Sequence, residues 1–223
     1  MFASNPRLIW AQSRFEFRGI LANGEQLVLN IMLPLLGLFW IQRNDDGTQP
    51  QLLLLLASIF ASNFTGTAIA TAFERRQGVL KALAISPLGR VGLVIAKVCA
   101  GAAISLLQLL LLLGTNALWE PGYLPPVSFW LALPILTAAA QGAALWLASA
   151  LRAEAVLAIA NAALIAVAVS AYVNLDLSIA VLNFCNPLSA AASAINRGGT
   201  DWLVLVTWAG AALTGAIRNF SWD

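Results

Sequence analysis

Long apolar stretches alternate with short charged segments along this chain, and each stretch has the size of a membrane-spanning helix. A helix needs about 20 apolar residues to cross the hydrocarbon core of a bilayer, and fewer when its flanking residues reach the interface. The pattern predicts about six transmembrane helices. Their expected ranges are 27–41, 52–73, 92–119, 129–151, 155–172 and 202–217.

Composition supports a membrane protein. Of the 223 residues, 60% are apolar and only 10% are charged, whereas soluble domains are about a quarter charged. The formal net charge of +2 gives no basic face for nucleic acid. We therefore predict an all-α integral membrane protein with one transmembrane domain, residues 1–223, that contacts membrane lipids and no nucleic acid.

The basic residues are distributed unevenly between the two predicted sides of the membrane. Only Arg43 and Arg197, of twelve Lys and Arg residues, fall on one side, and basic loops stay in the cytoplasm. Both termini are then cytoplasmic, as six spans require, and the expected location is the bacterial cytoplasmic membrane. Residues 1–26 lack the pattern of a cleavable signal, so insertion is expected through the spans themselves.

The segment 1–26 predicts an interfacial amphipathic helix. Asn5 and Pro6 suit its start, as an N-cap followed by proline at the first helical position. Arg7, Arg14 and Arg18 fall on one stripe, and most of the remaining surface is apolar. Such a helix lies in the membrane plane with its cations toward the headgroups. It could serve as a lipid anchor alone or also touch a cytoplasmic partner.

The segment 74–90 is the charged cytoplasmic connection between the second and third spans. It predicts a short amphipathic helix over 78–85, which Ser86 and Pro87 end because proline cannot continue a helix. A short helix joined to two spans suits a groove on another protein, although an ordinary charged loop would have the same composition. Lys97 lies near the inner end of the third span, from which its side chain can extend toward the interface.

The segment 173–200 precedes the last span on the outer side. Its apolar part, 176–184, is too short to cross the membrane, so we predict short re-entrant helices sheltered by protein. A plain surface loop with a local helix is the alternative. Polar uncharged side chains also occur within the spans, where they most often form hydrogen bonds between helices. These are Ser58, Ser62, Asn63, Thr67, Gln108, Gln141 and Asn161.

Several kinds of chemistry are excluded or disfavoured. The chain has no histidine and no CxxC, which excludes zinc sites and Ser-His-Asp triads within this chain. No G-x-x-x-x-G-K-[ST] phosphate loop occurs. The lack of charges deep in most spans argues against proton coupling and intramembrane hydrolysis. We therefore expect no catalytic residue, metal site or cofactor in this chain.

The 74–90 segment resembles the connection between spans two and three in the ABC type-2 exporter permease family. The matching residues are Glu74, Arg75, Gly78, Leu80, Leu83, Pro87, Leu88, Arg90 and Lys97. In that family the segment contains a coupling helix that docks onto a nucleotide-binding subunit. The resemblance implies a coupling role for this segment, and its basic residues Arg76 and Lys81 are included in the candidate set.

A second resemblance lies before the last span. Asn186, Pro187, Leu188 and Ser189, followed by the basic Arg197, are similar to the family segment that forms re-entrant helices on the outer side. The two motifs and the predicted spans occur in family order over nearly the whole chain. The resemblance implies a working unit of two permeases, identical or homologous, and two ATPases, with ATP and Mg²⁺ bound by the ATPase partner.

The sequence thus favours the permease subunit of an ATP-driven exporter that moves an amphipathic, drug-like or lipid-like cargo out of the cytoplasm or inner leaflet. A haem-exporter-type permease of cytochrome c maturation has a similar loop and length. A carrier driven by a gradient and a membrane scaffold are alternatives from other classes, and neither would depend on an ATPase.

Overall fold

Helices provide all the regular secondary structure in the described part of the chain, which the computed structural model gives as residues 6–44, 48–177 and 180–220. In chain order they are α1 (Pro6–Ala22), α2 (Gly24–Asn44), α3 (Thr48–Ala61), η1 (Ser62–Gly66), α4 (Thr67–Arg76), α5 (Val79–Ala84), α6 (Gly89–Asn116), α7 (Val127–Ala150), α8 (Ala153–Leu177), α9 (Ala180–Cys185), α10 (Pro187–Arg197) and α11 (Thr200–Asn219). The all-α prediction is confirmed. The predicted cap Asn5 lies outside the described residues.

Five helices in the described residues are long and apolar enough to cross a membrane. They are Thr48–Arg76, which joins α3, η1 and α4, together with Gly89–Asn116, Val127–Ala150, Ala153–Asn174 and Thr200–Asn219. The chain is therefore a multi-pass membrane protein. Helix α2 covers the predicted first span with 21 residues, but it is not one of these five, and the six-span count stays a prediction.

Large apolar side chains cover the outside of these helices. Leu110, Ile165 and Leu203 are each about two thirds exposed (67%, 65% and 67%), although all three lie within candidate spans. Leucine at such positions costs nothing against hydrocarbon. The surface of the bundle is therefore the surface that faces lipid.

Helix α7 lies in the middle of the bundle and packs against α11, α4, α6 and α10. Its buried face is rich in alanine: Ala139, Ala140, Ala144 and Ala148 are all fully covered. Gly142 lies on this face, where a Cβ would come within 2.7 Å of backbone atoms of Ala212 and Leu213 in α11. Small residues therefore bring the backbones of α7 and α11 into close contact, as is common where membrane helices pack.

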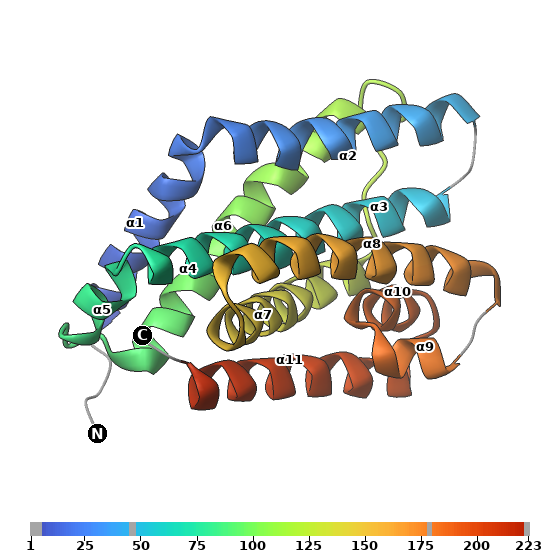
Figure 1. Ribbon diagram of the computed structural model, residues 1–223. Helices are drawn as coiled ribbons and strands as arrows, with labels where there is room; N and C mark the ends of the chain where they lie inside the picture. The colour runs from blue at the N-terminus through green and yellow to red at the C-terminus, as the bar shows by residue number, and fades with distance from the viewer. Residues whose placement is uncertain (1–5, 45–47, 178–179, 221–223) are drawn as a thin grey trace.

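The two ends of the bundle differ. Helix α5 and the C-terminal end of α11 lie at one end, and the short helices α9 and α10 lie at the other (Figure 1). Helix α1 packs along α6 and turns into α2 near Asn23. The predicted coupling segment and the predicted outer segment are thus at opposite ends of the molecule.

Candidate functional site

The connection between α4 and α6 contains the six-residue helix α5. Gly78 precedes it with φ of +78°, a conformation that glycine adopts at no steric cost. At its end the Ser86 hydroxyl donates to the Leu83 carbonyl at 2.7 Å, and Pro87 follows. Ser86 and Pro87 therefore follow the end of the helix directly, as predicted from the sequence.

Helix α5 divides its residues between an inner and an outer face. Leu80 is 1% exposed and packs with Leu93 and Val94 of α6, while Leu83 packs against the same cluster. Ile85, the C-cap residue directly after α5, is by contrast 90% exposed. Lys81, Pro87 and Arg90 are exposed as well. The two leucines therefore fix α5 to its own chain, and the exposed residues are those available to another protein.

Arg75 ties the end of α4 to the end of α7. Its guanidinium donates to the Ser149 carbonyl at 2.9 Å and also to the Leu151 carbonyl. These carbonyls are at the C-terminus of α7, where the last C=O groups have no partner within the helix. The neighbouring Arg76 forms a 2.7 Å ion pair with Glu154 at the start of α8. The coupling segment is thus joined to two further helices.

A buried charge cluster joins α1, α4 and α6. The Lys97 Nζ lies 2.8 Å from a Glu16 carboxylate oxygen and 2.9 Å from a Glu74 carboxylate oxygen. The Lys97 side chain is only 3% exposed, so it does not extend toward the interface in the way that its place in the sequence allows. Two carboxylates attract the ammonium inward, which a span considered alone does not reveal. Glu74, a predicted coupling residue, faces this cluster.

A polar network occupies the middle of the bundle at η1, where the helix widens to π geometry. The Asn63 amide donates to Ser105 at 2.6 Å, and Gln141 donates to Asn63 at 3.0 Å. Ser62 donates to Gln108 at 3.1 Å. The prediction that mid-span polar groups bond between helices is confirmed for these residues. Asn161 is exposed, and its amide donates within its own helix to Leu157.

The outer motif begins at Asn186, which caps α10. Its Oδ1 accepts from the backbone N–H groups of Leu188 at 2.8 Å and Ser189 at 3.2 Å, and Pro187 occupies the first turn. Its Nδ2 donates to the Val167 carbonyl of α8 at 2.7 Å. The asparagine therefore starts one helix and holds it against another, which explains the Asn-Pro pair.

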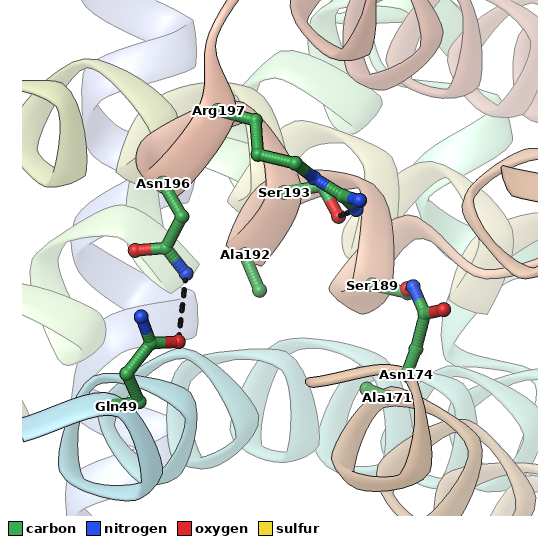
Figure 2. Close-up of a pocket in the computed structure, with 8 residues that line it drawn as sticks. All are labelled: Gln49, Ala171, Asn174, Ser189, Ala192, Ser193, Asn196 and Arg197. Carbon is green, nitrogen blue, oxygen red and sulfur yellow. Dashed lines mark hydrogen bonds between the residues drawn. The ribbon is translucent and has the colours of Figure 1, made fainter. Parts of the chain in front are cut away.

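Behind this cap, Asn183 collects three donors. Its Oδ1 accepts from Asn174 at 2.8 Å, from Ser189 at 2.7 Å and from Ser193 at 3.1 Å. Arg197 donates to Ser193 and lies 3.7 Å from Asp201. An adjoining cavity has a volume of about 140 Å³. Figure 2 shows its polar lining, which consists of Gln49, Asn174, Ser189, Ser193, Asn196 and Arg197. The structure brings Ser189 and Arg197 to one cavity.

The order of these features along the chain agrees with a known family. A family model described as ABC-2 type transporter matches residues 8–194, most of the chain. The chain belongs to the ABC-2 type transporter family. A comparison with curated proteins found no match. As an ABC-2 permease it is the membrane component rather than the ATPase, and family membership implies that it works with ABC ATPase partners.

Sequence reasoning missed two residues that organise this permease. Glu16 is the only acidic residue in α1 and lies off the stripe of Arg7, Arg14 and Arg18, and that position was the available signal. Asn183 gave no comparable signal, because its role depends on the fold of the segment around it.

The predicted coupling residues differ in exposure. Glu74, Leu80 and Leu88 face inward, while Arg76, Lys81, Pro87 and Arg90 are exposed.

Proposed function

We propose that this ABC-2 permease is half of the membrane part of an ATP-driven exporter, and that α5 receives the movement of the ATPase. The observation that carries the proposal is that Leu80 of α5 packs against the spans, while Ile85, the residue that follows α5, is almost fully exposed. A push on the exposed face would reach α6 through Leu80 and α7 through Arg75. ATP and Mg²⁺ would bind to the ATPase partner.

The proposed cargo is amphipathic, drug-like or lipid-like, and the direction is out of the cytoplasm or inner leaflet. The membrane would be the bacterial cytoplasmic membrane, with both termini inside. The end of the bundle that carries α5 also carries exposed Arg76, Lys81, Arg90 and Arg218, which supports this orientation by the positive-inside rule.

Replacing Ile85 with aspartate is the sharpest test. We expect I85D to fold normally and to lose association with its ATPase at least about tenfold, because an exposed apolar anchor at an interface contributes about 2 kcal/mol. Co-purification from native membranes and ATPase activity of the complex measure this. Leu118 is 77% exposed at the other end of α6, so L118D is the matched control.

A second substitution, Leu80→Asp, distinguishes loss of ATPase docking from loss of folding in the same segment. Because Leu80 is buried against α6, L80D should reduce the yield of folded monomer, whereas I85D should not. An I85D complex that retains its ATPase and its ATP-dependent transport would contradict the proposed role of α5.

We further propose that the exposed face of α8 contacts a second permease, identical or homologous. Of the candidate spans, Ala153–Asn174 is the least buried, with 17% of its most apolar stretch covered. Asn161 is exposed in the middle of this span. Its amide bonds only within its own helix and has no hydrogen-bond partner on another described helix. An amide facing lipid is unfavourable, so a partner helix that bonds to it would stabilise the pair.

Asn161→Leu should weaken the association of permeases about tenfold, since a hydrogen bond between membrane helices contributes about 1–2 kcal/mol. Co-expression with differently tagged copies, followed by crosslinking in native membranes, measures self-association. Thr214 is likewise an exposed polar residue that bonds to its own helix, but it lies on α11 instead of α8, so T214V is the control. Equal crosslinking of N161L and T214V would contradict a role for the α8 face.

A further inference from the structure

A pocket with basic side chains lies where the coupling segment begins. An open pocket of about 280 Å³ lies between the end of α4 and the start of α8, and it is lined by Ala72, Arg75, Arg76, Arg152, Ala153 and Glu154. Three arginines and one glutamate are among these residues, so the lining of the pocket carries a net positive charge. The proposed coupling mechanism uses none of the α8 residues in this pocket.

The three arginines differ in the hydrogen bonds and ion pairs that their side chains form. Arg75 is engaged with carbonyl oxygens of α7, and Arg76 is paired with Glu154, although both side chains are more than 60% exposed (62% and 66%). An exposed ion pair is weak and can exchange partners. Arg152 is exposed, and within the described residues no hydrogen bond or ion pair holds its side chain. Its guanidinium is therefore available to an anion.

The start of α8 adds a second attraction for anions. The helical ladder begins with the bond from the Val156 N–H to the Arg152 carbonyl at 2.9 Å. The N–H groups of Ala153, Glu154 and Ala155 therefore precede the ladder and have no acceptor within the helix. The N-terminus of a long helix attracts anions, and arginine binds phosphate in bidentate geometry.

Apolar side chains continue from the pocket along the spans. Leu157 lies one turn further along α8 and is 44% exposed, and Phe73 lies one turn back along α4 and is 36% exposed. A ligand held by the arginines would thus rest its apolar part on these side chains. The pocket also lies where three candidate spans end, Thr48–Arg76, Val127–Ala150 and Ala153–Asn174, which is the level of the headgroups.

From this geometry we propose that the pocket binds the phosphate headgroup of an anionic phospholipid, with Arg152 as the principal ligand and the acyl chains against Leu157 and Phe73. Basic pockets between membrane helices suit such headgroups. A soluble phosphate compound would use the arginines but not the apolar surface. The site does not depend on the proposed export function, because binding requires neither ATP nor an ATPase.

Titration of the delipidated full chain with phosphatidylglycerol, followed by native mass spectrometry, tests the site. We expect R152Q to weaken phosphatidylglycerol binding about tenfold, the effect of losing one hydrogen bond between charged groups. Arg218 is also exposed, in the last turn of α11 and outside this pocket, so R218Q should change binding less than about twofold. Equal effects of the two substitutions would overturn the proposal, because binding would then follow net charge alone.

Two further probes identify the source of the phosphate. Phosphatidylcholine should bind the wild-type chain and the R152Q variant with equal affinity. Glycerol phosphate should not compete with phosphatidylglycerol for the wild-type chain. Effective competition would indicate a soluble anion and overturn the lipid assignment. In native membranes, a photoreactive phosphatidylglycerol should label peptides that contain Phe73 or Leu157. Labelling confined to other spans, or protection of Arg152 by a bound protein subunit instead of lipid, would also overturn it.

Discussion

Replacing Lys97 with methionine is expected to destabilise the folded chain by about 3–5 kcal/mol, the typical cost of removing one partner from a buried ion pair. The substitution leaves the carboxylates of Glu16 and Glu74 close together and without their cation. The volume of the side chain changes little, so packing contributes a small part of the effect. Unfolding of the purified protein by SDS, followed by circular dichroism, measures the loss.

The triple variant K97M/E16Q/E74Q is the control. Removing all three charges abolishes the unpaired carboxylates while preserving size, so most of the lost stability should return. A K97M protein as stable as the wild type would show that the ammonium does not hold these helices together. Failure of the triple variant to recover would place the effect in packing rather than in charge.

Replacing Gly142 with alanine should destabilise the bundle by about 1–3 kcal/mol, the usual cost of overpacking a tight contact. The new Cβ would lie 2.7 Å from backbone atoms of Ala212 and Leu213. A backbone cannot rotate out of the way as a side chain can, so α7 and α11 must move apart. The same SDS titration measures the change.

Gly210→Ala provides the comparison in the partner helix. A Cβ at Gly210 meets nothing within 4 Å, and alanine favours a helix by about 1 kcal/mol over glycine. G210A should therefore be neutral or slightly stabilising. If G142A and G210A behave alike, the close approach of α7 and α11 is not important for stability.

Much of the fold could be predicted, because the patterns involved are local. Apolar length located all five candidate spans within a few residues, as with α6, which runs from Gly89 to Asn116 against a predicted 92–119. The end of α5, just before Ser86 and Pro87, and the cap of α10 at Asn186 also depend on neighbours in sequence. Local hydrogen bonds and proline geometry are features that a sequence shows directly.

Contacts between distant segments could not be predicted in the same way. Lys97 looked like a cation near a span end, and only the packing of α1 and α4 on α6 brings Glu16 and Glu74 to it. Leu80 and Ile85 are both apolar residues of one short segment, yet one is buried and the other exposed. A short helix has too few turns for its periodicity alone to show which face contacts the spans.

The charge cluster also has a consequence for the order in which the protein is made. Glu16 and Lys97 are 81 residues apart in the chain, and ribosomes add about 5–20 residues per second. Helix α1 is therefore synthesised about 4–16 s before Lys97, the cation that pairs with Glu16. Over that interval the carboxylate of Glu16 can remain in the headgroup water. Helix α1 is thus fixed in its final position only after α6, which follows it in the chain, has entered the membrane.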